Sequence, residues 1–307
     1  MSEPRVAVVV RTKDRPLFLK RALRSILSQT LEAWECVIVN DGGDPAAVDA
    51  AIVTLPAAAR ERVTAVHAET SRGRWVSANV GVLNTTAPFL VLHDDDDSWH
   101  PKFLERAVAE LDAHPERDAA LSRIEIIWEE RKGDEYVPVR REIFQNQLQD
   151  ALLSDALLFN RFVPIGFVYR RSLHEELGLY DEGLPVVGDW AFNLRVLSRG
   201  SIPYLSETPY AYWHQRTGES GANGNSVIDA RDAHARTDAL VRDRALRAYV
   251  DENGLGLVLY LTKFIDQRFV EVEAGIRAEV RATREELVRT HLVARAARRV
   301  RRALRRS

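Results

Sequence analysis

Four consecutive aspartates, Asp94 to Asp97, are the residues of this chain that point most directly to chemistry. They follow an apolar run at 89–92 that the pattern predicts as a buried strand. Four adjacent carboxylates repel one another, so a fold keeps them either in a solvated turn or beside a cation. If extended geometry continues past the strand, Asp94 and Asp96 share one face. Two carboxylates there offer hard oxygen ligands to Mg²⁺ or Mn²⁺, ions that usually also bind a substrate's phosphates.

The elements that must position this cluster alternate along the first half of the chain. Apolar strands are predicted at 6–10, 36–39, 63–67 and 89–92, with helices between them at 16–27, 45–58 and 74–85. This alternation predicts a largely parallel sheet with helices on both faces. Ligands of such sheets bind beyond the carboxyl ends of the strands. Polar segments follow all four strands, at 11–15, 40–43, 69–74 and 94–97, so we expect them to line one crevice.

The middle and the end of the chain follow other patterns. Segments 122–129 and 136–140 predict a β-hairpin, 166–170 a strand and 189–198 a helix. Beyond about residue 225, glycine and proline nearly vanish and the pattern stays helical. We therefore predict a first domain at 1–225 and a helical extension at 226–307. The extension is expected either to pack on the first domain or to form a homodimer contact.

Composition limits the class of protein. The chain has 307 residues, of which 46% are hydrophobic and 29% charged, as in ordinary globular proteins. A single cysteine, Cys36, excludes an intramolecular disulfide and fits a reducing compartment. No apolar run approaches the ~18 residues of a membrane span, and the N-terminal run is too short for a signal peptide. We expect a cytoplasmic protein.

The last 17 residues, 291–307, carry seven arginines and no acidic residue. Because the net charge is −2, the rest of the chain carries −2 − 7 = −9. Apolar residues recur at helical spacing between the arginines, which predicts a basic amphipathic helix. An anionic membrane surface is the favoured partner, and a solvated helical tail is the alternative. The acidic body and the lack of interleaved aromatic residues argue against nucleic acid.

Five motifs in order give the chain a family resemblance. They are VVVRTKDRPLFLKRALRSILSQT, VIVNDGG, RGRWVSANVGV, LHDDDDSWHP and VVGDWAFNLRVL, and the resemblance covers roughly residues 5–215. This series resembles the family-2 glycosyltransferases. The resemblance implies an α/β GT-A fold, with a mostly parallel Rossmann-like sheet flanked by helices. It also implies an inverting transfer from a nucleotide-sugar donor, with 1–225 as the catalytic domain.

The resemblance implies roles for residues after the first two strands. Thr12, Asp14 and Arg15 match the loop that lines the nucleotide, and Asp41 matches the aspartate that reads the base, usually uracil. Without the other motifs, Asp41 would read as an ordinary turn residue. Asn79 matches the helix that packs under the diphosphate.

Charge at the diphosphate departs from the family pattern. The family often has an arginine before the asparagine, whereas this chain has Ala78, so Arg72 or Arg74 is expected to supply the positive charge. The family's metal-binding DxD motif aligns with Asp94-Asp95-Asp96. Asp96 would then ligate Mn²⁺ or Mg²⁺, and Asp94 would contact the ribose or a metal-bound water. A shift by one residue would move these roles to Asp95 and Asp97.

Asp189 is the predicted catalytic base. In the family an acidic residue before a tryptophan at a helix start faces the acceptor, and an inverting transfer needs a group that takes the acceptor hydroxyl's proton. Capping of the helix is the structural alternative for Asp189. The family commonly has Glu-Asp here, whereas this chain has Gly188-Asp189. Trp190 is expected to touch the acceptor.

The segment after the last motif is expected to close over the donor. His214 is either a third metal ligand or a member of an aromatic cluster, and Arg216 is a candidate phosphate clamp. The residues at 217–225 have the composition of a mobile loop.

These motifs favour one function over three others. The first strand is followed by 11–15, which has no glycine, so a nucleotidyltransferase loop and a G-x-G-x-x-G dinucleotide site are both excluded. A catalytically degenerate binding or scaffold protein of the same fold remains the alternative. We predict a metal-dependent inverting glycosyltransferase that moves a sugar from a nucleoside-diphosphate sugar, with UDP favoured, to a hydroxyl. The basic tail suggests a lipid-linked glycan acceptor of the bacterial cell envelope, reached from the cytoplasmic face of the inner membrane.

Overall fold

The computed structural model describes residues 3–133, 135–216 and 231–304, and the side chains of the last segment at 232–285 and 287. The chain forms two compact units, Met1–Val241 and Arg242–Ser307. The predicted boundary at 225 and the predicted loop at 217–225 lie outside the described residues. The assignment of catalysis to 1–225 stays a prediction.

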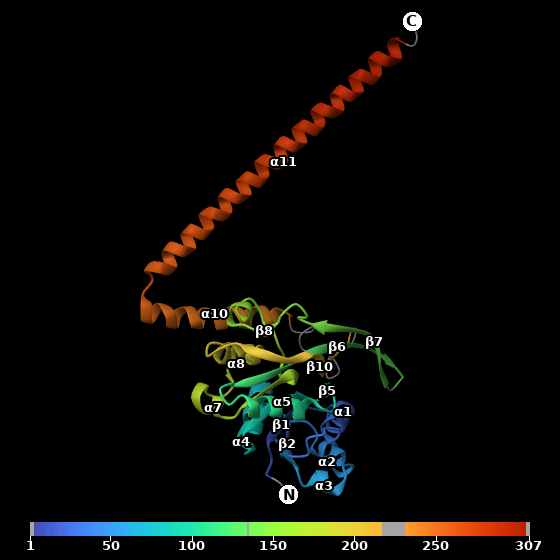
Figure 1. Cartoon of the computed structure of the whole chain (residues 1–307), viewed down its shortest axis with the longest axis vertical. Coiled ribbons are helices and arrows are strands. Elements are labelled where there is room, and N and C mark those ends of the chain that lie inside the picture. The colour runs from blue at the N-terminus through green and yellow to red at the C-terminus, as the bar shows by residue number, and fades with distance from the viewer. Residues whose placement is uncertain (1–2, 134, 217–230, 305–307) are drawn as a thin grey trace. The chain divides into compact units, whose positions relative to one another are not determined.

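The first unit (Figure 1) is built on one sheet. The order of its strands is β3-β2-β1-β4-β9-β6-β10-β5. The predicted parallel half is present as β1 (Val6–Thr12), β2 (Trp34–Asn40), β3 (Val63–His67) and β4 (Phe89–Asp94). The rest is mixed: β9 (Phe167–Arg170) runs antiparallel to β4 and β6, whereas β10 (Ile202–Arg216) runs parallel to β6 (Ala119–Lys132). β5 (Ser98–Trp99) and β8 (Asp150–Ala151) pair with β10, and β7 (Glu135–Phe144) completes the predicted hairpin with β6.

Helices accompany the sheet, among them those predicted at 16–27, 74–85 and 189–198. They are α1 (Pro16–Leu27), α2 (Pro45–Val53), α3 (Ala57–Arg60), α4 (Arg74–Leu83), α5 (Phe103–Ala113), α6 (Leu153–Ala156), η1 (Pro164–Gly166), α7 (Ser172–Leu177) and α8 (Gly188–Leu197). The helix predicted at 45–58 is divided in two, because Pro56 cannot continue a helix and instead begins the separate turn of α3. Pro16 and Pro45 each stand at the first helical position, where a missing N–H costs nothing.

The core lies on both faces of the parallel strands. All seven residues of β1 are buried, as expected for a strand covered on two sides. Cys36 of β2 is a buried member of this core, beside Val8 in the register. Helix α4 packs on β1 so closely that a Cβ on Gly81 would collide with the side chain of Val9.

The helical extension comprises α10 (Arg231–Asn253), which begins in the first unit, and α11 (Gly256–Leu304). The predicted helical character of this part is thus present to Leu304. Within the described residues, neither helix is long and apolar enough to cross a bilayer. The side chains of the basic tail at 291–307 lie outside the described residues, so its partner stays a prediction.

Candidate active site

The carboxyl ends of three neighbouring strands bring the predicted site segments together. Thr12 ends β1 beside Asn40 of β2, and Arg11 stands opposite Asp94, the last residue of β4. Strand geometry stops at Asp94, and the next two residues form a turn closed by an Asp97 N–H bond to the Asp94 carbonyl. The condition of extended geometry past β4 is therefore not met, because the chain turns. The predicted alternation of the aspartate side chains between two faces does not apply.

The first two aspartates of the cluster differ in environment. The side chain of Asp94 is 40% exposed and forms an ion pair with the buried guanidinium of Arg11. Asp95 is buried and accepts bonds from the Thr12 hydroxyl, at 2.7 Å, and from Arg15, at 2.8 Å. Burial raises the pKa of Asp95 to about 7, although the charge of Arg15 opposes this. Asp94 is thus the more accessible carboxylate.

Asp96 is held by two guanidinium groups. Its Oδ2 accepts a bond from Arg15 at 2.8 Å and a bond from Arg216, the last residue of β10. Burial alone would raise the pKa of Asp96, but the charges of Arg15 and Arg216 lower it to about 2. The ring of Phe18 lies under both guanidiniums, at 4.7 Å from Arg15 and 4.2 Å from Arg216, and fixes them in place.

His214 belongs to a buried hydrogen-bonded group. Its Nδ1 lies 2.8 Å from the carboxylate of Glu129, and its Nε2 lies 2.8 Å from the Ser98 hydroxyl. Glu129 also accepts a bond from Arg21 at 2.9 Å, and the backbone N–H of His214 donates to Asp97. Burial lowers the pKa of His214, although the hydrogen bond to Glu129 opposes this. Both ring nitrogens of His214 are therefore engaged, and the ring would have to release Ser98 to bind a metal through Nε2.

The carboxylates fit a divalent cation only together with a substrate. Among the described residues, no three His, Cys, Asp or Glu side chains are arranged as a metal site. Mg²⁺ characteristically binds through one or two carboxylates, with waters and substrate phosphates as the remaining ligands. Asp94 and Asp96 supply such carboxylates, and the guanidiniums beside them suit phosphate oxygens.

Asp41 organises the loop that follows β3. Its carboxylate accepts bonds from the Ser71 hydroxyl at 2.7 Å and from the backbone N–H of Arg72 at 2.8 Å. Its pKa is lowered: burial would raise it, but these bonds favour the ionised form. Gly42 has φ 73°, and a Cβ there would collide with the backbone N of Ser71, so the two loops require glycine at this contact. Asp14 joins the same region by accepting a bond from Asp44 N–H at 2.9 Å.

Two predicted site residues of α4, Arg74 and Asn79, lie in different environments. Arg74 stands at the helix start, where the charges of Asp94, Asp96 and Asp189 act on it. Asn79 is buried, and its amide bonds to the backbone of Tyr180, with distances of 2.9 and 3.0 Å. Asn79 therefore holds the segment that leads into α8, and its direct contact with a donor stays a prediction.

Asp189 lies in the first turn of α8 within a chain of amides. Its Oδ2 accepts a bond from Asn160 Nδ2 at 2.8 Å, and Asn160 Oδ1 in turn accepts one from Asn193 at 3.0 Å. The second bond fixes which end of the Asn160 amide faces Asp189. Burial raises the pKa of Asp189, whereas the Trp190 N–H and the charges of Arg11 and Arg74 oppose this. A carboxyl with a raised pKa suits a proton acceptor.

The neighbours of Asp189 bear on the acceptor contact predicted for Trp190 and on Gly188, where the family commonly has a glutamate. Trp190 is only 2% exposed and its indole donates to the Ala156 carbonyl at 2.7 Å, so the structure does not support the predicted acceptor contact. Val187, not Asp189, precedes the helix as its cap residue. A Cβ on Gly188 would lie 2.6 Å from the ring of Trp75, which leaves no room for the family's glutamate.

Sequence reasoning placed Arg11 in a polar segment of the site without giving it a role, and it missed Glu129 and Asn160. Glu129 and Asn160 stand in segments without a motif signal of their own, and all three residues acquire their partners only through the fold. Arg11 carried a clue, since it is a charged residue that follows five apolar residues in a buried strand.

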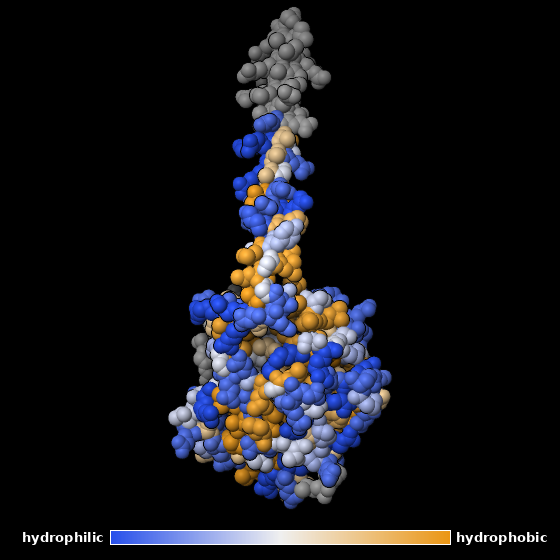
Figure 2. Space-filling view, turned by 90° about the vertical axis from the view of Figure 1, so that its left-hand side faces the viewer, coloured by the Kyte–Doolittle hydropathy of each residue, from blue (hydrophilic) through white to orange (hydrophobic). Residues whose placement is uncertain are grey.

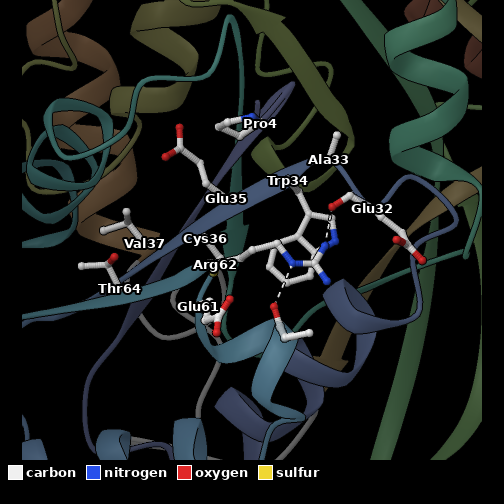
Figure 3. A pocket seen from close by; sticks show the side chains of 11 residues that line it. Pro4, Glu32, Ala33, Trp34, Glu35, Cys36, Val37, Glu61, Arg62 and Thr64 are labelled. Carbon is white, nitrogen blue, oxygen red and sulfur yellow. Dashed lines mark hydrogen bonds between the residues drawn. The ribbon is translucent and has the colours of Figure 1, made fainter. Parts of the chain in front are cut away.

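A separate pocket of about 450 Å³ lies at the opposite, amino ends of β2 and β3 (Figure 3). Its wall includes Trp34, on which the guanidinium of Arg62 stacks at 4.3 Å. None of the predicted site residues lines it.

Sequence comparisons place the chain among known proteins. It matches the family model described as Glycosyl transferase family 2 over residues 7–178. It is 34% identical over 193 residues to the Uncharacterized glycosyltransferase YwdF of Bacillus subtilis (strain 168), covering 62% of this chain and 67% of the relative. It is 27% identical over 233 residues to the PGL/p-HBAD biosynthesis glycosyltransferase of Mycobacterium bovis (strain BCG / Pasteur 1173P2), covering 75% and 82%.

Solved structures share the fold. The S. aureus TarS 1-349 structure in complex with UDP-GlcNAc matches with a TM-score of 0.56 and 20% identity, covering 72% of this chain and 61% of that chain. The mannosyltransferase PcManGT from Pyrobaculum calidifontis, in complex with GDP-Man and Mn²⁺, matches with a TM-score of 0.58 and 20% identity, covering 80% and 65%. The chain thus spans less than two thirds of both solved chains. The predicted GT-A fold class is confirmed.

Proposed function

Because this chain belongs to glycosyl transferase family 2, we propose that it moves a sugar from a nucleoside-diphosphate sugar to an acceptor hydroxyl, with inversion at the anomeric carbon. One observation carries this proposal. The aspartate cluster with its guanidiniums and the buried carboxyl of Asp189 lie within electrostatic reach of each other, through Arg11 and Arg74.

The donor half of the site is the cationic end of the sheet. Arg15, Arg216 and Arg74 supply charge for a diphosphate, and Thr12 and Asp14 stand in the loop beneath it. Asp41 would read the base, with Arg72 on the same loop. UDP is the favoured nucleotide, supported by the TarS complex with UDP-GlcNAc, although PcManGT holds GDP-Man.

A divalent cation, Mn²⁺ or Mg²⁺, would be held by Asp96 and Asp94, with His214 as a further candidate ligand. Bound there, it would offset the charge that develops on the leaving diphosphate. The Mn²⁺ in the PcManGT structure supports this proposal. Arg15 and Arg216, now bound to Asp96, would turn to the phosphate oxygens, which accept bidentate guanidinium bonds.

The acceptor half is centred on Asp189. Its carboxylate would take the proton of the attacking hydroxyl, while Asn160 holds one of its oxygens in place. We further propose a glycan or lipid-linked acceptor of the cell envelope, because the arginine-rich helix at 291–307 suits an anionic membrane surface.

The test is a thermal-shift panel with UDP, dTDP, GDP and CDP, each with Mn²⁺ or with EDTA. We expect one nucleotide to raise the melting temperature in the presence of Mn²⁺, and Asp96→Ala to abolish that rise. Asp112→Ala, which removes a carboxylate from an exposed ion pair with Arg5, is the matched control and should leave the rise intact.

A chain that responds to no nucleotide would contradict the proposal and favour a degenerate fold used for binding. A rise in melting temperature that persists in EDTA would contradict only the proposed metal dependence.

A further inference from the structure

Helix α11 carries one apolar stripe with an 11-residue repeat. Starting at Val258, steps of three, four and four residues reach a Val, Leu, Ile, Phe or Thr every time, and never a charged residue. The stripe is Val258, Leu261, Ile265, Phe269, Val272, Ile276, Val280, Thr283 and Leu287. An 11-residue repeat corresponds to ~3.67 residues per turn, close enough to the α-helix that the stripe stays on one face. Its next positions, His291, Ala294 and Arg298, leave the apolar pattern.

The side chains of this stripe are exposed within their own unit. Phe269 is 67% exposed, Ile276 57% and Leu287 65%. Figure 2 shows the apolar surface along the described part of this helix, interrupted by hydrophilic side chains. A helix of 49 residues with such a face is not stabilised by its own hydrogen bonds alone, because helical stability in proteins comes mostly from packing of an apolar face.

We propose that the stripe of α11 pairs with the same stripe of a second copy of this chain, as a coiled coil. The area is sufficient. A large apolar side chain that is fully buried removes roughly 60–120 Å² from water. Eight such side chains therefore offer on the order of 500–1,000 Å² per chain, against ~800 Å² per partner in a standard interface.

The charges beside the stripe favour a protein partner over lipid. Residues 258–287 contain five basic and six acidic side chains. Several of them form ion pairs along the helix, such as Arg268 with Glu271 and Arg277 with Glu273. A helix lying in a membrane surface has a basic polar face, whereas mixed charges flank the seams of coiled coils. The basic residues begin to dominate only at 291–307, past Leu287, the last apolar position of the stripe.

The repeat also fixes the hand of the pair. Heptads impose a left-handed supercoil, whereas an 11-residue repeat gives a right-handed one. The paired helices are thus nearly straight, with a slight right-handed twist.

Sedimentation equilibrium of the full chain tests the proposal with two adjacent residues of α11. Phe269 lies on the stripe and Val270 lies off it, about 100° further around the helix, with 67% and 62% exposure. We expect the wild type and Val270→Glu to dimerise, and Phe269→Glu to raise the dimer dissociation constant by on the order of 100-fold or more, since two buried aromatic side chains are lost per dimer. The helical signal in circular dichroism at 222 nm should grow with protein concentration in the wild type and in Val270→Glu. It should not grow in Phe269→Glu.

A wild type that stays monomeric at all concentrations would overturn the proposal, as would equal weakening by Phe269→Glu and Val270→Glu. Dimerisation that appears only with phosphatidylglycerol vesicles would also overturn it, because lipid would then be the occupant of the stripe. None of these readouts depends on glycosyl transfer, so the proposal stands or fails independently of the proposed function.

Discussion

At the residue scale, the candidate site is a set of paired charges rather than a row of free carboxylates. Arg11 holds Asp94, and Arg15 and Arg216 together hold Asp96. A buried carboxylate without such partners would lose its charge. The arginines therefore offset the charges of Asp94 and Asp96, whereas burial raises the pKa of Asp95 and of Asp97.

The amide of Asn160 leads to a prediction about pH. Its bond to Asp189 favours the ionised carboxylate, so Asn160→Ala should raise the pKa of Asp189 further. A base works only when it is ionised, so the acidic limb of the pH profile of kcat/KM should move to higher pH by about one unit. The rate should fall about tenfold at pH values below that limb and change little above it.

The measurement is the rate of nucleotide release from the donor across the pH range, with Asp189→Asn as the inactive reference. Charged neighbours from three elements act on Asp189, namely Arg11, Arg74 and Asp94, and all are unchanged in the variant. A limb that stays in place while the rate falls uniformly would assign Asn160 a purely structural role.

At the scale of elements, the start of α8 depends on a close contact with α4. A Cβ on Gly188 would lie 2.6 Å from the Trp75 ring, and that ring is buried and stacked on Tyr180. We expect Gly188→Ala to lower the free energy of unfolding by about 1–3 kcal/mol, as overpacking does. Urea denaturation measures this, and Gly200→Ala, where no atom lies within 4 Å of the new Cβ, should change it little.

The aromatic cluster that joins β9, α7 and α8 should make stability depend on pH. His174 is buried beside Phe192 and Tyr180, and burial lowers its pKa to about 4, although its bond to the Gly178 carbonyl opposes this. In the unfolded chain the pKa of His174 has its ordinary value of 6.5. The unfolded chain therefore binds this proton at a higher pH than the folded chain does. The stabilisation from the neutral ring is complete above pH 6.5 and is lost as the pH falls towards 4.

His174→Gln should remove this part of the pH dependence. The free energy of unfolding of the wild type should fall between pH 6.5 and 4 by up to ~1.4 kcal/mol per pH unit more than that of the variant. Urea denaturation at a series of pH values measures both slopes, with the surface change His114→Gln as the control. Parallel slopes would contradict the assignment.

The parallel strands and their helices were readable from sequence, and the charge pairs were not. β1, β2 and β4 follow from short apolar runs, because burial on both faces leaves few polar positions. The break at Pro56 was overlooked although proline gave the signal. Partners such as Asn160 for Asp189, or Glu129 for His214, are 29 and 85 residues apart, and no local pattern encodes such distances.

At the scale of the whole molecule, the charge asymmetry separates an acidic body from a basic end. We expect the full chain to co-sediment with phosphatidylglycerol vesicles and not with phosphatidylcholine vesicles. Changing the seven arginines of 291–307 to glutamine should abolish binding, at ~1 kcal/mol per charge near an anionic surface. The control changes Arg268 and Arg277 to glutamine, because both arginines already pair with glutamates. Undiminished binding of the glutamine tail would contradict the membrane role.

The single thiol of the molecule has a practical consequence. Cys36 is sealed in β2, and burial raises the pKa of its thiol to about 12, so almost no thiolate exists at neutral pH. Maleimides and mild oxidants attack the thiolate, and they will therefore leave this chain unmodified while it is folded. A cysteine introduced anywhere on the surface becomes the sole reactive handle, and spin labels or dyes can report on α11 and on the crevice without a cysteine-free background.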